Sequence, residues 1–353
     1  MCHLIYTDTF YMKRKWIRWV SWILLTPIIL FVILMVLLYV PPVQNLLRRE
    51  VTAYASKATG MQIQVERIDL RFPLNLLVRG VEVIQQPDTL LSLESLNVRV
   101  QAWPLIKGKV EVDEVTLSRV AVNSADLMEG MKIKGVLGRF FLQSHGVDLS
   151  NELAVINQVE LSDTHVQLLM NDTTTTPKDT TASAPINWKV ALHQLKLKNV
   201  SFSMQLPADS MRMAAHIGEA AIDDAQADLK NQYYDLKKFL LSGTSVSYDT
   251  GTAQPAEGFD ASHIAVRDIR IALDSLLYKG RDMNAVIREF TMNERSGLSV
   301  TSLTGRAYSN DSVICVPGLK LNTPHSEIDL SAHTYWELVN IPTTGRLSAR
   351  LNA

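Results

Sequence analysis

The sequence has few cysteines and almost no excess of charge of either sign. Cys2 and Cys315 are the only cysteines among 353 residues, which excludes a disulfide framework and a zinc site built from thiolates. Lys and Arg number 35 against 36 Asp and Glu. Without a basic surplus the chain is poorly suited to displace counterions from phosphates, so we expect no nucleic-acid partner. Hydrophobic residues make up 47% of the chain, which is too many for a disordered protein.

The motifs of the common enzyme classes are absent as well. No Gly-x-Ser-x-Gly, Walker A, Gly-x-Gly-x-x-Gly or His-Glu-x-x-His sequence occurs, and the eight histidines are scattered without a metal-ligand spacing. Adjacent acidic residues such as Asp113 and Glu114 point to opposite faces if they lie in a strand, so they do not form an acid/base pair. We therefore expect no enzymatic activity, no catalytic residue, no cofactor and no bound metal ion.

Charge is missing altogether from residues 19–40. At about 1.5 Å per residue this run makes about 33 Å of helix, enough to cross a bilayer core of about 30 Å. The first Ala-x-Ala sequence after the run, at residues 53–55, lies far beyond its end, so we expect a single-pass signal anchor that is not cleaved. The basic residues at its amino-terminal flank are Lys13, Arg14, Lys15 and Arg18.

These flanking charges favour a cytoplasmic tail of residues 1–18 and a translocated body. Arg48, Arg49 and Lys57 follow on the other side of the run, and they leave the opposite orientation open. The sequence also leaves open whether translation begins at Met1 or at Met12.

Residues 41–60 predict a short amphipathic helix with Gly60 as its carboxyl-terminal cap. We expect it to cover the edge of the first strand rather than to lie on the membrane surface, because an open sheet edge needs cover. The apolar residues at helical spacing are Val43, Leu46, Leu47, Val51, Tyr54 and Ala58.

From Met61 onward apolar residues recur with a period of two, in short runs bounded by glycine and proline. We divide this body into a first β segment (residues 61–170), a Thr-rich linker loop (171–185) and a second β segment (186–353) that we expect to be truncated. No convincing helix is expected between the short strands, so the pairing should be antiparallel. Residues 226–241 could form either a short helix or a strand pair. The predicted fold is mainly β, an elongated and curved antiparallel sheet of roughly 20 strands, about 100 Å long at about 4.8 Å per strand.

One pattern recurs three times, at residues 110–122, 154–166 and 190–202. Apolar residues alternate with polar ones but are interrupted twice by a polar doublet, such as Asp113-Glu114 and then Ser118-Arg119. Strict alternation would send the apolar set to the opposite face after each doublet. A bulge or a two-residue hairpin restores the face. We favour a bulge at the first doublet and a hairpin at the second.

The repeats place one apolar set on one face of the sheet. That face forms either a dry packed core or an open groove for acyl chains, and from periodicity alone we rank the packed core first, because it is the more frequent meaning of an apolar strand face. If the sheet stays open, the lining residues are Val110, Val112, Val115, Leu117, Val120, Val122, Val159, Leu161, Val166, Leu195, Leu197, Val200 and Phe202.

Several segments resemble the AsmA-like superfamily, in particular the amino-terminal region of its TamB-like translocation and assembly module branch of Bacteroidetes type. The resemblance covers nearly the whole chain from Met12 and rests on degenerate apolar patterns. The segments that carry it are 42–44 with 59–60, 64–65 with 68–70, 76–83, 105–110 with 115–117, 186–190 and 297–305.

This resemblance implies an inner-membrane anchor and a periplasmic β-groove. It also implies a role in outer-membrane biogenesis, namely conduction of phospholipid acyl chains along the groove, assistance to outer-membrane protein assembly, or both. A barrel partner similar to TamA is implied through a carboxyl-terminal part that we expect beyond Ala353. The alternative is a membrane-anchored structural or protein-interaction module with a dry β core.

Overall fold

The computed structural model of the chain describes residues 26, 36, 39–72, 74–101, 104, 111–124, 130–148, 151–171, 187–338 and 346–352. The predicted tail with its four basic residues lies outside these residues, as do Val110, most of the predicted span 19–40 and the linker after Asn171. Among the described residues, no helix has both the length and the apolar character needed to cross a bilayer.

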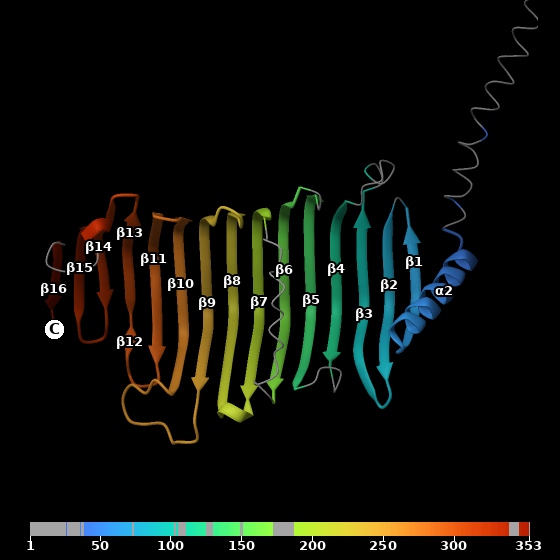
Figure 1. Cartoon of the computed structure of the whole chain (residues 1–353), viewed down its shortest axis with the longest axis horizontal. Coiled ribbons are helices and arrows are strands. Elements are labelled where there is room, and N and C mark those ends of the chain that lie inside the picture. The colour runs from blue at the N-terminus through green and yellow to red at the C-terminus, as the bar shows by residue number, and fades with distance from the viewer. Residues whose placement is uncertain are drawn as a thin grey trace, which may run out of the picture.

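The described strands form a single curved sheet in which sixteen strands follow one another almost entirely in chain order (Figure 1). The two-residue strand β12 pairs with β11 beside the main path. The strands are β1 (Gln62–Arg71), β2 (Asn75–Gln85), β3 (Asp88–Val100), β4 (Val112–Asn123), β5 (Met131–Asp148), β6 (Leu153–Met170), β7 (Lys189–Leu206), β8 (Met211–Asp228), β9 (Tyr233–Asp249), β10 (His263–Lys279), β11 (Asp282–Glu294), β12 (Ser299–Val300), β13 (Ser302–Ser309), β14 (Val313–Asn322), β15 (Glu327–Tyr335) and β16 (Arg346–Asn352).

The sheet is shorter than predicted because its strands are longer. Strands β5 to β8 have 18 residues each, so the described residues form fewer strands than the predicted twenty. Fifteen strands lie along the main path, and at about 4.8 Å per step they extend roughly 67 Å.

One pair of strands differs from the predicted antiparallel arrangement, because β6 and β7 are parallel. Parallel neighbours need a connection that returns from one end of the strand to the other. The chain between Met170 and Lys189, which contains the predicted linker, makes that connection. The two predicted β segments are thereby joined in one sheet.

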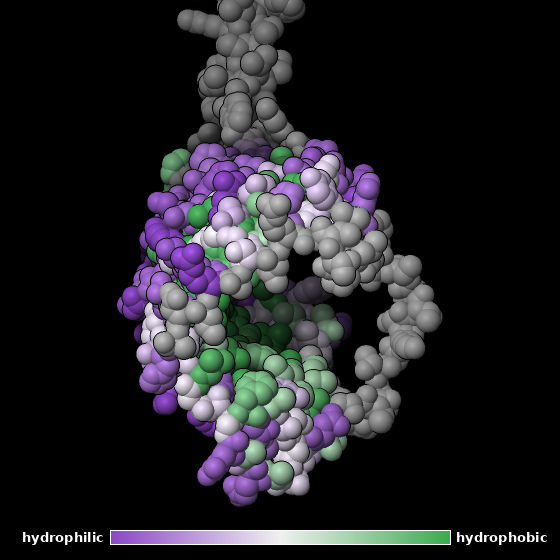
Figure 2. Space-filling view, turned by 90° about the vertical axis from the view of Figure 1, so that its left-hand side faces the viewer, coloured by the Kyte–Doolittle hydropathy of each residue, from purple (hydrophilic) through white to green (hydrophobic). Residues whose placement is uncertain are grey.

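No described element covers the concave face of the sheet. Among the described elements, the extensive contacts are those between neighbouring strands and that of the helix at residues 41–59 with β1. No side chain among the described residues is less than 2% exposed. Figure 2 looks along the long axis and shows a hollow whose wall is hydrophobic and an outer surface that is mostly hydrophilic.

The helix α2 (Pro41–Thr59) lies across the β1 end of the sheet (Figure 1) and ends at Gly60, which has φ 71°. The backbone N–H of Gly60 donates to the Ser56 carbonyl at 3.0 Å. Glycine adopts this left-handed conformation without the steric cost of a Cβ, so the predicted cap is confirmed.

The helix covers the open edge of β1, as predicted, but it does so with polar side chains. Gln44 Nε2 donates to the Leu70 carbonyl at 2.9 Å, and an Arg48 terminal nitrogen donates to the Val65 carbonyl at 3.0 Å. One backbone N–H of the edge, that of Ile63, donates to Ser56 Oγ at 3.1 Å. These side chains form hydrogen bonds with some of the β1 backbone groups that no described strand pairs with.

The repeats contain no hairpin at the second doublet, which corrects the prediction. Strands β4, β6 and β7 continue through it, and the second residue of each doublet takes a left-handed conformation: Arg119 has φ 47°, Asp163 φ 51° and Asn199 φ 53°. One such residue absorbs the extra position and leaves the apolar set on one face. At the first doublet the predicted bulge is confirmed in β4, where Asp113 is skipped in the pairing of Val100 with Val112 and of Arg99 with Glu114.

These left-handed residues lie at the same level of neighbouring strands. Asp163 falls opposite Gly138 on one side and Asn199 on the other, between flanking pairs that keep their register. Asn199 Nδ2 donates to Asp163 Oδ1 at 2.8 Å, and Arg119 pairs with Glu94 at the same level of β3 and β4. The line of irregular residues therefore crosses the sheet from strand to strand, on its polar side.

Candidate functional site

The register of the sheet brings the predicted lining residues together. In β6 and β7, Val159 lies beside Leu195, Leu161 beside Leu197, and Val166 beside Phe202. The same register continues into β4 through β5, so that equivalent positions of the repeats align. Apolar side chains thus run across the strands, parallel to the long axis of the sheet.

Four transverse rows contain these residues, and each is named here after its member in β7. The Leu195 row is Leu70, Leu76, Val98, Val115, Leu142, Val159, Leu195, Ile222, Phe239, Leu273 and Ile287. The Leu197 row is Ile68, Val78, Leu96, Leu117, Phe140, Leu161, Leu197, Ala220, Leu241, Ile271 and Phe290. The Val200 row is Val65, Val81, Leu93, Val120, Leu137, Thr164, Val200 and Ile217. The Phe202 row is Ile63, Val83, Leu91, Val122, Gly135, Val166, Phe202, Ala215, Val246 and Val266.

The rows extend beyond the predicted set in both directions. Val112 pairs with Val100 at the margin of the face. The members in β1 to β3 and in β8 to β11 were missed as lining residues, although β1 carries the same apolar spacing at Ile63, Val65, Ile68 and Leu70. That spacing was the signal that could have identified them.

The apolar face remains accessible over most of its length, although Ile68, Leu93 and Ala220 on the rows are buried. The described side chains of the predicted set are half-buried, except that Val122 is 38% exposed and Phe202 is 41% exposed. Val246, on the same row as Phe202, is 40% exposed. Packed cores bury such residues almost completely, so the described residues leave this face open.

A polar residue on this face has its hydroxyl turned to the chain's own backbone. Thr164, in the Val200 row, is 8% exposed, and its Oγ1 donates to the Ser162 carbonyl at 3.2 Å. The hydroxyl is therefore satisfied locally, and the continuity of the apolar row is kept.

The opposite face is charged. Its ion pairs join adjacent strands: Arg99 with Glu114 at 3.2 Å, Lys189 with Asp228 at 3.4 Å, and Arg288 with Asp274 at 3.0 Å. Each pair includes a side chain that is about half exposed, so each contributes little to stability. Their effect is to keep this face in water and to leave the concave face as the apolar one.

The arrangement most similar to a catalytic site is formed by residues that alternate with the apolar rows and so belong to the opposite face of the sheet. Ser201 Oγ lies 3.0 Å from His216 Nδ1, and both line a cavity of about 540 Å³ together with His165, Arg267 and Arg295. No carboxylate contacts His216 in the part of the chain that the structure describes, so nothing there orients the imidazole as a general base. Within the described ranges, no three His, Cys, Asp or Glu side chains converge as a metal site.

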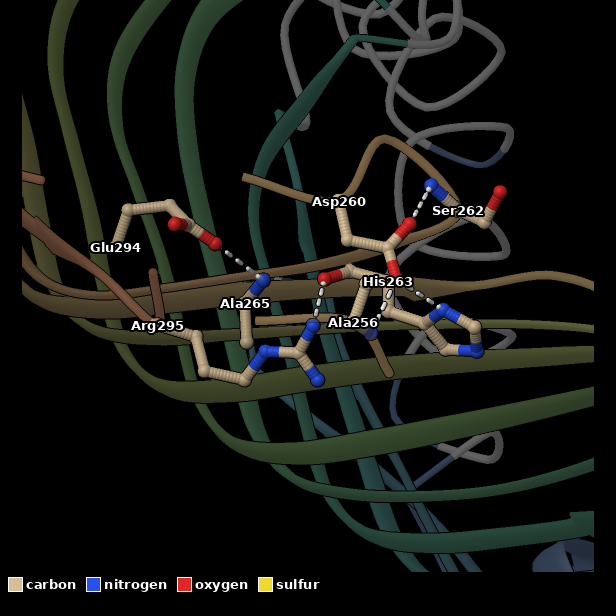
Figure 3. A network of polar contacts seen from close by, with 7 residues as sticks. All are labelled: Ala256, Asp260, Ser262, His263, Ala265, Glu294 and Arg295. Carbon is tan, nitrogen blue, oxygen red and sulfur yellow. Dashed lines mark hydrogen bonds and ion pairs between the residues drawn. The ribbon is translucent and has the colours of Figure 1, made fainter. Parts of the chain in front are cut away.

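A second polar network fastens a long loop to the sheet (Figure 3). The Asp260 carboxylate accepts hydrogen bonds from the backbone N–H groups of Ala256 at 3.0 Å and Ser262 at 2.9 Å, and it lies 2.9 Å from His263 Nδ1. An Arg295 terminal nitrogen donates to the His263 carbonyl at 2.8 Å.

This network holds the loop and offers no free catalytic group. The Ala256 and Ser262 amides and the His263 side chain stabilise the charged form and lower the pKa of Asp260 to about 2. The Ser296 side chain, together with the Ser296 backbone N–H that donates to Glu294 at 2.6 Å, lowers the pKa of Glu294. Both carboxylates are therefore engaged with the backbone as anions.

A scan of the sequence against protein-family models gives no match, and a search of curated proteins finds no similar protein.

Proposed function

We propose that the protein is a non-enzymatic carrier that conducts phospholipid along the concave apolar face, with the acyl chains on the rows and the head groups in water. The observation that carries this proposal is the largely accessible apolar face, whose Leu197 row is apolar on each of eleven strands. At about 4.8 Å per strand the row is about 48 Å long.

The energetics favour such a surface as a path for lipid. An acyl chain loses about 0.8 kcal/mol of burial per CH₂ on entering water, on the order of 10 kcal/mol for a whole chain. Apolar side chains at every step keep the chain covered while it moves. The charged outer face keeps the carrier itself in water.

The localisation, the orientation and the partner are proposed from the sequence alone. Residues 19–40 anchor the protein in the inner membrane with the amino terminus in the cytoplasm and the body in the periplasm. The resemblance to the AsmA-like superfamily extends the role to outer-membrane biogenesis, including assistance to outer-membrane protein assembly with a barrel partner similar to TamA.

Photo-crosslinking in native membranes tests the proposal. Photoreactive residues at Leu197 and Val200 should capture phospholipid, whereas the same residues at Lys196 and Lys198, outward neighbours on β7, should not. Protein adducts at Leu197 without lipid would favour the interaction module, and lipid capture only at the lysine positions would contradict the proposal.

A further inference from the structure

The helix α2 presents three different surfaces at the end of the sheet. Gln44, Arg48, Thr52 and Ser56 recur every fourth residue and form one stripe. Three of them bond to the β1 edge. This stripe therefore fixes which side of α2 faces the edge, and it leaves two flanks.

One flank lies on the polar side of the sheet. Arg49 and Ala53 of α2 line a cavity of about 790 Å³ with Gln64, Glu66 and Glu82. Gln64 and Glu82 are paired neighbours in the register opposite to the apolar rows. The Arg49 flank of the helix thus faces the same side as the charged face of the sheet.

The other flank is apolar and exposed. At about 100° per residue, Leu47, Val51 and Tyr54 lie within about 60° of one another, on the side of the edge stripe away from Arg49 and Ala53. Leu47 is 42% exposed, Val51 45% and Tyr54 77%. Because the polar flank lies on the charged side, this apolar flank lies on the side of the apolar rows.

The chain immediately before α2 indicates what meets this flank. Residues 19–40 form an uncharged apolar run that ends directly before Pro41. At the junction, the rings of Tyr39 and Phe72 lie 6.4 Å apart, and Phe72 is 85% exposed. Aromatic rings at the ends of an apolar run are typical of a membrane interface.

We propose that the Leu47, Val51 and Tyr54 flank of α2 is the loading surface of the carrier, over which acyl chains pass from the bilayer onto the apolar rows at β1. The inference rests on the proposed function and adds where the lipid arrives. It assigns α2 two tasks: its polar stripe closes the sheet edge, and its apolar flank connects the membrane to the concave face.

The test uses the full chain in native membranes with a photoreactive residue at Leu197 as the reporter of lipid on the rows. Val51→Glu places a charge on the loading surface and should lower phospholipid capture at Leu197 by about tenfold or more, because a carboxylate is poorly tolerated on an apolar path. The matched control Ala53→Glu places the same charge on the polar flank of α2 and should leave capture unchanged.

A second measurement introduces no new charge into the helix. A photoreactive residue at Tyr54 should capture phospholipid, and one at Ala53 should not. Undiminished capture at Leu197 in Val51→Glu, or no capture at Tyr54, overturns the loading surface while the carrier itself stands. Absence of capture at Leu197 in the unaltered chain contradicts the carrier and the loading surface together.

Discussion

At the scale of single residues, the sheet depends on close backbone approach along its line of irregular residues. A Cβ added at Gly218 would lie 2.8 Å from the Gly243 carbonyl oxygen, which is backbone and has little room to move. Gly135, in contrast, is in a strand where the nearest atom to an added Cβ, the His165 carbonyl oxygen, is 3.5 Å away.

Gly218→Ala should therefore lower the thermal unfolding midpoint, with a loss of roughly 1 to 3 kcal/mol in the free energy of unfolding. Gly135→Ala should be neutral or slightly stabilising, because it restricts the unfolded chain without a clash. Equal midpoints for the two variants would contradict the close approach.

The Asp260 network makes a prediction about pH. The pKa of this carboxyl is about 2 in the folded protein and 3.8 for an ordinary aspartate. Because the folded pKa is depressed, the stabilisation is present above about pH 4 and is lost as the pH falls toward 2.

Amide hydrogen exchange of Ala256 and Ser262 should accordingly become faster, relative to the intrinsic rate, as the pH is lowered from 5 to about 2. In Asp260→Asn, exchange should be fast at neutral pH and this pH dependence should be absent. Protection that does not change over this range would show that the carboxylate is not what holds the loop.

At the scale of elements, α2 offers a matched pair of substitutions one turn apart. Ser56 Oγ accepts from the Ile63 backbone N–H, so Ser56→Ala should cost about 1 kcal/mol and speed the exchange of that amide. Thr52 Oγ1 is buried and, among the described residues, has no hydrogen-bond partner. Thr52→Val should be neutral or stabilising, and a loss as large as that of Ser56→Ala would contradict this assignment.

The sequence was sufficient for the bounds of α2 but not for its orientation. Helical spacing and Gly60 predict where the helix lies and ends, because both are local properties. The side that contacts β1 was not predictable from apolar spacing, since Gln44 and Ser56 bond to backbone atoms distant in the sequence. The exposure of Leu47 and Tyr54 is explained only by the structure, in which a different, polar side of α2 contacts the β1 edge.

The backbone conformation at the second doublet of the repeats could not be predicted from the apolar pattern. A hairpin and a left-handed residue both return the apolar set to one face, so the pattern itself does not distinguish them. Asp163 and Asn199 are residue types that tolerate positive φ, which is the local signal for the observed conformation. Arg119 carries no such signal, and its ion pair with Glu94 forms only once β3 and β4 are paired.

At the scale of the whole molecule, the apolar rows were largely encoded in the repeats, whereas the relative direction of β6 and β7 was not. Positions such as Leu117, Leu161 and Leu197 occupy equivalent places in the pattern, and the register aligns them. The parallel pairing of β6 with β7 is not specified by anything in the alternation of apolar and polar residues.

The central claim is that this face is one continuous lipid path. Its most direct test is a photo-crosslinking scan along the Leu197 row in native membranes, with the photoreactive residue placed in turn at Val78, Leu117, Leu197 and Ile271. We expect phospholipid adducts at all four positions, from β2 to β10. Adducts confined to Val78, or protein adducts in place of lipid at the inner positions, would contradict a continuous path.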